Sequence, residues 1–333
     1  MMIRDAGLRF KFGIAVGLAA AMLSVSSFGQ SKYPERAIRM VVPFAPGGNT
    51  DVVTRIYAAK MTPLLGQQML VDNKAGADGA IGSAEVARAK PDGYTLLMGT
   101  ASTHSINPLT MDKPGYDPVK DFAGIAVLST TPIAIAVHPT LPKTLQELIK
   151  RVKANPGKYS YGSAGVGSLN HLTGELFKIV TGGLDIVHVA YKGGGPSVRD
   201  LIAGQIPTAF VTFSSAVVFH RNGRLRILAV FSNKRSQAAP DIPTSAEAGL
   251  PGVLAYTYTA VLAPAGTPKA IVDQLYRATS KVVADSGFQK SLFDQTADLV
   301  TDSNPGNMTH FLNEEIEKWA GVLKAIGGKG KVH

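Results

Sequence analysis

The stretch Val42-Pro43-Phe44-Ala45-Pro46-Gly47-Gly48-Asn49-Thr50-Asp51 joins an apolar run to the start of a helical pattern. A strand that passes through Pro and Gly into a helix leaves several amide N–H groups at the helix N-terminus without intrahelical partners. Such an end suits an anion, because the amides and the helix dipole both favour negative charge. The stretch therefore predicts a strand-turn-helix unit with a candidate anion-binding turn.

Short β-branched runs alternate with helical patterns along most of the chain. This alternation indicates an α/β architecture of mainly parallel sheets flanked by helices. We expect a capping box at Thr144 and Glu147, and prolines in the first helical position at Pro268 and Pro305. The expected strands are residues 38–42, 69–72, 94–98, 133–137, 159–161, 186–189, 209–213 and 225–230.

Two long apolar segments, residues 125–137 and 254–263, are candidates for crossovers between two lobes. If both segments cross, residues 30–132 and 256–333 form one discontinuous domain, and residues 133–255 form the other. This topology is typical of a hinged, two-lobed receptor of the Venus-flytrap type, in which the two crossovers form the hinge.

The N-terminus carries Arg4, Arg9 and Lys11 before an apolar run over residues 12–25. This pattern predicts a signal peptide over residues 1–29. The run is shorter than the roughly 20 apolar residues that a membrane helix needs. We therefore expect an exported, periplasmic protein.

The composition excludes several kinds of chemistry. The chain has no cysteine, so disulfides, thiolate metal sites and thiol catalysis are excluded. Its formal net charge is +10, but the basic clusters are small and lack interleaved aromatic residues, so we expect no nucleic-acid partner. A positive field does favour the attraction of small anions.

Two further glycine-rich turns follow predicted strands, at residues 161–168 and 191–197. The carboxyl ends of strands in an open α/β sheet face the ligand crevice, so the three turns could line one cleft. Their amides and the hydroxyls of Thr50, Ser163 and Ser168 would then hold a carboxylate. The alternative is that glycine serves only the backbone geometry of short loops, and the sequence leaves both interpretations open.

Enzyme motifs are absent from these turns. Ser163 and Ser168 do not lie in a G-x-S-x-G elbow, and no glycine run matches a P-loop or a complete dinucleotide fingerprint. The seven histidines include no H-E-x-x-H. An exported serine hydrolase that uses Ser163 or Ser168 with His171 is the alternative function, although we expect His171 and Glu175 to form only a helix-face hydrogen bond.

His104 follows Ser102 and Thr103 at the end of a predicted strand. Strand ends border the expected cleft. We interpret His104 as a ligand contact and not as a catalyst.

Several short motifs recur here in an order and spacing that are specific together, although each is weak alone. They are 42–48 with Asp51, 92–97, 162–165 with 167–168 and 171–172, 191–193 with Pro196, 204–205, 223–226 and 263–268. On these motifs the chain resembles the Bug family, the periplasmic solute receptors of tripartite tricarboxylate transporters. The resemblance extends from Tyr33-Pro34 through the C-terminal helix.

The resemblance implies a receptor that clamps a small carboxylate between two lobes and presents it to a membrane permease, without catalysis, cofactor or metal. In relatives, the first glycine loop and the facing loop of the middle domain hold the carboxylate through amides, hydroxyls and bridging waters. With the strand-end candidates included, the expected ligand-binding residues are Phe44, Gly47, Gly48, Asn49, Thr50, Asp51, Ser102, Thr103, His104, Ser163, Gly165, Gly167, Ser168, His171, Lys192 and Gly193.

One departure from the family pattern concerns the ligand. Relatives often carry acidic residues in the strand after Gly-Gln, where this chain has Pro207 and Val211. A carboxylate there could pair with a ligand ammonium, so its absence favours a non-amino mono- or dicarboxylate or an aromatic acid. We expect a monomer whose membrane partner is a permease, with a sensor kinase as the alternative partner.

Overall fold

The computed structural model describes residues 33–328 of the chain. The signal peptide predicted over residues 1–29 lies outside the described residues. Residues from Arg36 onward form one structural unit, to which every helix and strand below belongs. Among the helices of the described part, none has the length and apolar character of a membrane span.

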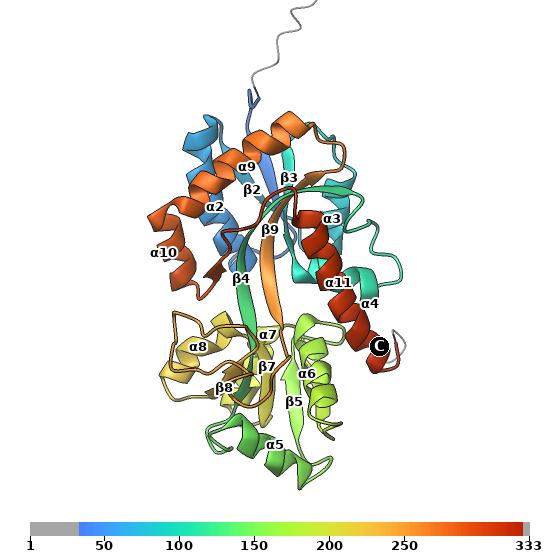
Figure 1. Ribbon diagram of the computed structural model, residues 1–333, viewed down its shortest axis with the longest axis vertical. Coiled ribbons are helices and arrows are strands. Elements are labelled where there is room, and N and C mark those ends of the chain that lie inside the picture. Colours follow the sequence, from blue (N-terminus) through green and yellow to red (C-terminus); the bar gives the residue numbers. More distant parts are fainter. Residues whose placement is uncertain (1–32, 329–333) are drawn as a thin grey trace, which may run out of the picture. The chain divides into compact units, whose positions relative to one another are not determined.

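Ten strands form a continuous sheet flanked by helices, which confirms the predicted α/β fold (Figure 1). β8 (Arg226–Val230) and β10 (Asp298–Leu299) each pair with β4. The other strands lie side by side in the order β2 (Met69–Asn73), β1 (Ile38–Val42), β3 (Thr95–Thr100), β9 (Tyr256–Pro264), β4 (Phe122–Val137), β7 (Thr208–Thr212), β5 (Ser160–Ser163) and β6 (Val187–Ala190).

The long strand β4 joins two sets of strands. Its residues 122–132 pair with β9, and its residues 133–137 pair with β7 and, in part, with β8. We call β1, β2, β3, β9 and β10 the first strand set, and β5, β6, β7 and β8 the second. Pairing is parallel between β1 and its neighbours and between β5 and its neighbours, whereas β4 and β9 run antiparallel to theirs. The sheet is therefore mixed, and not mainly parallel as the sequence predicted, because the two long strands β4 and β9 run against their neighbours.

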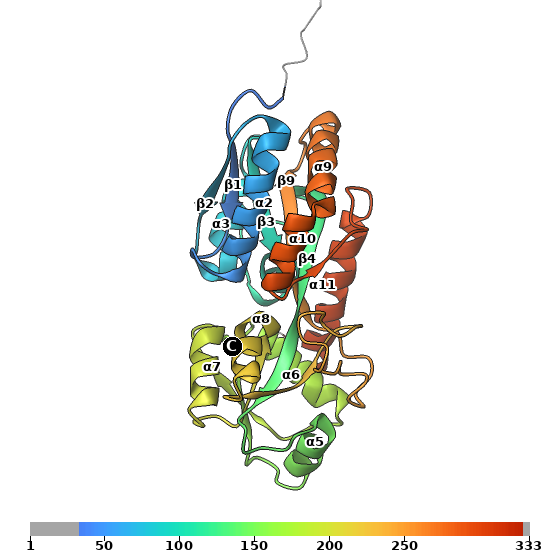
Figure 2. The ribbon, with the colours of Figure 1, turned by 90° about the vertical axis from the view of Figure 1, so that its left-hand side faces the viewer.

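Helices cover both strand sets (Figures 1 and 2). Beside the first set lie α2 (Asn49–Leu65), α3 (Ala80–Ala87), α9 (Lys269–Ala284), α10 (Ser286–Asp294) and α11 (Met308–Ala325). Beside the second lie α5 (Leu145–Lys153), α6 (Leu169–Val180), α7 (Gly194–Ile202) and α8 (Phe213–Arg221). Three short segments, η1 (Ala77–Gly79), η2 (Ser102–Ile106) and α4 (Asn107–Thr110), complete the helical elements of residues 33–328.

Large side chains fill the core on both strand sets. Tyr57, Trp319, Tyr161 and Phe210 are almost completely buried. Burial of each such aromatic side chain contributes a few kcal/mol at roughly 25 cal/mol per Å² of apolar surface. The Tyr57 hydroxyl lies 2.7 Å from the Thr279 hydroxyl and so joins α2 to α9.

The helix starts agree only in part with the sequence. Thr144 caps α5 as predicted, because its hydroxyl accepts a hydrogen bond from the Glu147 amide at 3.2 Å. The first-position prediction for Pro268 is wrong, since Pro268 has an extended ψ of 135° and is itself the N-cap of α9.

The prediction for Pro305 is also wrong, because α11 begins only at Met308. Two asparagine side chains hold a turn before the helix. The Asn307 side-chain oxygen accepts from the Asn304 amide at 2.9 Å, and the Asn304 side-chain oxygen accepts from the Gly306 amide at 2.9 Å. This turn delays the start of the helix until after Asn307.

Candidate functional site

The loop between β1 and α2 is held by the buried carboxylate of Asp51. One of its oxygens accepts hydrogen bonds from the Gly47 amide at 2.9 Å and from Arg55 at 3.0 Å, and the other accepts from the Asn73 side chain at 2.9 Å. Burial alone would raise the pKa of Asp51, but these hydrogen bonds outweigh it and hold the pKa below its ordinary value. The Asp51 carboxylate and the Gly47 amide therefore stabilise the loop by hydrogen bonds to each other, and neither is left for a ligand.

The donors left over in this loop are the first amides of α2. Gly48, the N-cap residue, offers no side-chain cap, and within residues 33–328 the amides of Asn49 and Thr50 have no acceptor. α2 is 17 residues long, so its aligned peptide dipoles place about half a positive charge at this end. Two free donors and a partial positive charge therefore coincide at Asn49 and Thr50.

The loop between β5 and α6 also uses most of its polar groups internally. The Ser168 hydroxyl donates to the Gly165 carbonyl at 2.7 Å and accepts from the His171 amide at 3.2 Å, which caps α6. The Gly167 amide donates to His171 Nδ1 at 3.1 Å. Within the described residues, the first amides of α6, those of Leu169 and Asn170, have no acceptor.

Ser163 and His171 lie behind this loop, next to His188. The Ser163 hydroxyl accepts from the Gly165 amide at 3.1 Å and lies 2.7 Å from His188 Nε2. The rings of His171 and His188 stack with centroids 4.0 Å apart. His171 Nε2 lies 3.9 Å from Glu175, which is too far for the predicted helix-face hydrogen bond, because Glu175 Oε1 instead accepts from Tyr161 and Lys178.

The loop between β6 and α7 rests on the previous loop. The Tyr191 amide donates to the Ser163 carbonyl at 3.2 Å, and the Gly193 amide donates to the Ala164 carbonyl at 3.0 Å. Gly193 has a φ of 105°, a conformation that L side chains rarely adopt. α7 begins at Gly194 immediately after it, so this loop brings a third helix N-terminus close to the second.

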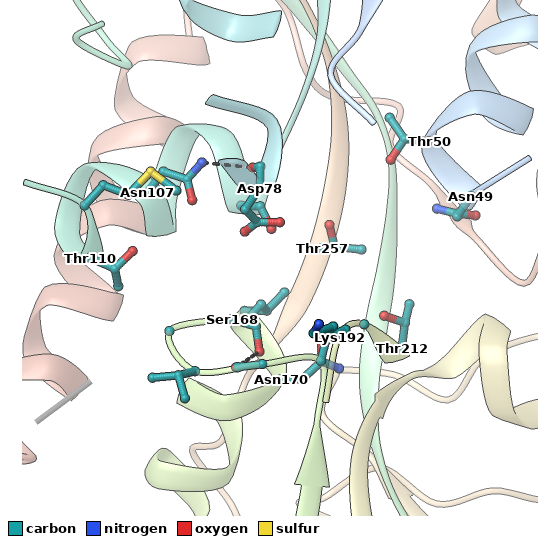
Figure 3. Close-up of a pocket in the computed structure, with 18 of the residues that line it drawn as sticks. Asn49, Thr50, Asp78, Asn107, Thr110, Ser168, Asn170, Lys192, Thr212 and Thr257 are labelled. Atoms are coloured by element: carbon teal, nitrogen blue, oxygen red, sulfur yellow. Dashed lines mark hydrogen bonds between the residues drawn. The ribbon is translucent and has the colours of Figure 1, made fainter. Parts of the chain in front are cut away.

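These three loops border one cleft of about 800 Å³. Asn49, Thr50, Asp78, Asn107 and Thr110 lie on one side of it, Ser168, Asn170, Lys192 and Thr212 lie opposite, and Thr257 lies between (Figure 3). The lining residues are Asn49, Thr50, Asp78, Ser102, Asn107, Thr110, Met111, Asp112, Lys113, Ala164, Gly165, Val166, Gly167, Ser168, Leu169, Asn170, Lys192, Gly193, Thr212 and Thr257.

The field in the cleft is set mainly by helix ends. The N-termini of α2, α6 and α7 border it, and Thr212 is the N-cap residue of α8. The charged lining side chains are two acids, Asp78 and Asp112, and two lysines, Lys113 and Lys192, whose formal charges cancel. The partial positive charges of the helix N-termini therefore make the cleft suited to a small anion.

Half of the sixteen residues predicted to bind ligand line this cleft, and half lie outside its lining. Those in the lining are Asn49, Thr50, Ser102, Gly165, Gly167, Ser168, Lys192 and Gly193. The lining does not include Phe44, Gly47, Gly48, Asp51, Thr103, His104, Ser163 and His171.

His104 is the clearest of the residues that lie behind the cleft. Its side chain is fully buried, packs edge-on against Phe122 at 4.8 Å between ring centroids, and has Nδ1 2.8 Å from the Thr103 hydroxyl. Burial lowers the pKa of His104 to about 3. The ring is therefore neutral at physiological pH and forms part of the core.

Asp78 and Thr212 are cleft residues that the sequence reasoning missed. Each lies at a junction where a strand passes into a helix, which is the pattern that identified the other turns. Thr212 ends β7 directly before α8, and Asp78 lies in the glycine-containing turn Gly76–Gly79 between β2 and α3. Asn107, Thr110 and Thr257 carried no comparable local signal. Their positions depend on how distant elements pack.

The cleft does not assemble the serine hydrolase that was the alternative. The Ser168 hydroxyl is used by Gly165 and by the His171 backbone, while His171 Nδ1 accepts from the Gly167 amide. Ser163 does lie beside a histidine, His188, but Ser163 is completely buried outside the lining. In residues 33–328 there is also no group of three or more side chains suited to a metal ion.

The fold and the cleft together define an α/β protein whose cleft is suited to a small anion. The chain matches the sequence profile of the tripartite tricarboxylate transporter family receptor over residues 53–328. It is 35% identical to protein BugT of Bordetella pertussis over 321 residues, which covers 96% of this chain and 97% of BugT. The chain therefore belongs to the tripartite tricarboxylate transporter receptor family, which confirms the resemblance to Bug proteins.

Solved structures of similar proteins share this fold. Rpa4515 of R. palustris, solved with adipate, has a TM-score of 0.80 and 34% identity, and the match covers 89% of this chain and 99% of that one. MatC from Rhodopseudomonas palustris, solved with bound malate, has a TM-score of 0.75 and 32% identity, and the match covers 87% of this chain and 99% of that one.

Proposed function

We propose that this protein is an extracytoplasmic receptor that binds a small carboxylate in the cleft and delivers it to the permease of a tripartite tricarboxylate transporter. The observation that carries the proposal is the group of amides at the first turns of α2 and α6 that have no acceptor within residues 33–328 and that lie on opposite sides of the cleft (Figure 3). Membership of the receptor family and the carboxylates bound by Rpa4515 and MatC support the same class of ligand.

The number of free donors is sufficient for useful affinity. Micromolar binding requires about −8 kcal/mol, and each hydrogen bond to a charged group contributes about 1.5 to 3 kcal/mol before ordering costs. One helix end would fall short of this requirement. Donors from Asn49 and Thr50 on one side and from Leu169 and Asn170 on the other could meet it together.

We propose that the two sides of the cleft move as lobes, with residues 30–132 and 256–333 in one domain and residues 133–255 in the other. The change of partner along β4, from β9 to β7 and β8 after Pro132, supports a hinge at this position. Closure would bring both sets of amides onto one anion and would shift the open and closed populations by the difference in ligand affinity between the two states.

The candidate residues then divide by role. Asn49, Thr50, Ser102, Gly165, Gly167, Ser168, Lys192 and Gly193 would touch the ligand or its waters, since they line the cleft. The residues outside the lining would shape the loops, as Asp51 does for Gly47 and as His171 does for Gly167. On this proposal the protein acts without catalysis, as a periplasmic monomer.

Calorimetry with a panel of carboxylates tests the proposal. The panel should contain succinate, malate, adipate, citrate, glutamate, aspartate, benzoate and nicotinate, and native mass spectrometry of freshly purified protein should search for a co-purified acid. We expect saturable binding of at least one acid and a rise in melting temperature with ligand concentration, because a ligand that binds only the native state stabilises it. Failure of every acid in both measurements would contradict a carboxylate receptor.

A further inference from the structure

Asp78 is an acidic residue in a cleft that otherwise favours anions. It lies in the turn Gly76–Gly79 with a left-handed backbone, φ 46° and ψ 40°. Its carbonyl accepts a hydrogen bond from the Asn107 side chain at 2.9 Å, and the Gly79 amide donates to the Gly76 carbonyl at 3.0 Å. The turn is therefore held from both sides, and it presents the Asp78 carboxyl group to the cleft (Figure 3).

Among the described residues, the carboxyl group of Asp78 has a hydroxyl partner but no basic one. The Asp78 side chain is exposed to the solvent of the open cleft, and its carboxyl group forms a hydrogen bond with the Ser102 side chain. Within residues 33–328 no lysine or arginine forms an ion pair with Asp78. Acceptor capacity therefore remains for a partner that enters the cleft.

The opposite side of the cleft has the complementary character. It carries the Leu169 and Asn170 amides without acceptors, together with Lys192. A ligand that carried only carboxylates would satisfy this side and would repel an ionised Asp78. A ligand that also carried a hydrogen-bond donor would satisfy both sides at once.

We propose that Asp78 determines specificity in the cleft by accepting a hydrogen bond from an ammonium or hydroxyl group of the ligand. The preferred ligand is then a small amino acid or hydroxy acid, and not a plain carboxylate. This inference rests on the proposed receptor function. It also revises the expectation drawn from Pro207 and Val211, because an acid is present on the other side of the cleft from the one that the family pattern suggested.

Matched ligand pairs test the inference on the whole mature protein. Calorimetry at pH 7.5 should compare succinate with malate and aspartate, glutarate with glutamate, butyrate with 4-aminobutyrate, and benzoate with 4-hydroxybenzoate. In the pairs that bind, we expect the member with the donor to bind at least tenfold more tightly, because a site that offers an acceptor discriminates against an analogue that lacks the donor.

Two substitutions assign the preference to Asp78. Asp78→Asn keeps the size and tolerates the left-handed backbone but removes the negative charge, and it should reduce the preference for the ammonium-bearing member to about threefold or less. The matched control is Asp273→Asn, which removes an acid that pairs with Lys269 outside the lining and should leave the preference unchanged. If Asp78→Asn fails to fold, as judged by circular dichroism, Ser102→Ala replaces it. We expect the preference of Ser102→Ala to fall, because the Asp78 carboxyl group loses the hydrogen bond that positions it, while that of Asp273→Asn does not change.

The outcomes separate the two proposals. Plain acids that bind as tightly as their donor-bearing partners, or a preference that survives in Asp78→Asn, would overturn the role of Asp78 and leave the receptor function standing. Absence of binding by every acid in the panel would overturn both. Tighter binding of succinate or glutarate as the pH falls would indicate a protonated Asp78 that donates to a second ligand carboxylate, and this result would also overturn the inference.

Discussion

His171 stacks on His188 with ring centroids 4.0 Å apart, directly behind the loop that faces the cleft. Each histidine also holds that loop, because His171 Nδ1 accepts from the Gly167 amide and His188 Nε2 lies 2.7 Å from the Ser163 hydroxyl. Both contacts depend on the protonation state of the rings. Protonation of His171 at Nδ1 would therefore remove the acceptor of the Gly167 amide.

We predict that acid destabilises the protein through this pair. Burial, the neighbouring His171 and Lys178 lower the pKa of His188 to about 4, although Glu175 opposes them, and burial also lowers the pKa of His171. The folded state therefore binds fewer protons than the unfolded state, whose histidines titrate near 6.5. The contribution to stability is complete above pH 6.5 and is lost as the pH falls toward 4, by on the order of 1 to 3 kcal/mol.

Urea unfolding between pH 8 and pH 4.5 checks this dependence. His188→Gln should reduce the loss of unfolding free energy across that range. His310→Gln is the control, because His310 is largely exposed beside Glu314. Equal pH dependence in the wild type and in His188→Gln would show that the histidine pair is not responsible.

Asp51→Asn should weaken ligand binding although Asp51 does not line the cleft. The substitution removes the charged acceptor of the Gly47 amide and of Arg55, so we expect a loss of about 1 to 3 kcal/mol in the free energy of unfolding. It should also weaken calorimetric affinity, because the amides of Asn49 and Thr50 lose their fixed position. Asp273→Asn, which affects only an exposed ion pair with Lys269, should change stability by less than about 1 kcal/mol.

Asn49→Pro removes one of the donors without breaking the helix. Proline is tolerated at the first helical position, and the extended backbone of Gly48, with ψ 167°, suits a residue that precedes proline. We expect affinity to fall about 10- to 100-fold, which corresponds to one charge-assisted hydrogen bond. Thermal unfolding should change little.

The matched control for Asn49→Pro is Ser286→Pro. Ser286 is the first residue of α10, follows an extended residue, and lies outside the cleft lining. The Ser286→Pro substitution should leave ligand affinity unchanged. If Asn49→Pro binds every acid as the wild type does, the Asn49 amide is not a ligand donor.

Two helical glycines should respond to alanine in opposite directions. A Cβ at Gly174 in α6 would lie 2.4 Å from the buried ring of Tyr161, whereas a Cβ at Gly321 in α11 would meet nothing within 4 Å. Gly174→Ala should therefore destabilise the protein by about 1 to 3 kcal/mol through overpacking. Gly321→Ala should stabilise it by up to about 1 kcal/mol, because alanine has the higher helix propensity, and urea unfolding would contradict this reasoning if both variants shifted the same way.

The sequence predicted the features that depend on local residue patterns, namely the strand-to-helix turns and the long apolar strands. Strand-turn-helix order identified the turns at Asn49, Ser168 and Lys192, and the same rule would have identified Thr212 and Asp78 had it been applied to every junction. The two apolar segments predicted as crossovers are the long strands β4 and β9.

The sequence could not predict which polar groups remain free, since that depends on distant partners. Asp51 meets Asn73 from β2, and His104 is enclosed by Phe122 from β4. The residues adjacent to Asp51 and His104 in the chain led to the prediction that both would line the cleft. Neither lines it, because each packs against residues from a distant strand.

The most direct test of the central proposal is a crystal structure of the protein with a carboxylate that calorimetry has shown to bind. We predict that the carboxylate oxygens lie within hydrogen-bond distance, about 2.7 to 3.2 Å, of the Asn49 or Thr50 amide on one side and of the Leu169 or Asn170 amide on the other, directly or through one water. A carboxylate bound outside the cleft, or inside it with these amides left to bulk water, would contradict the account.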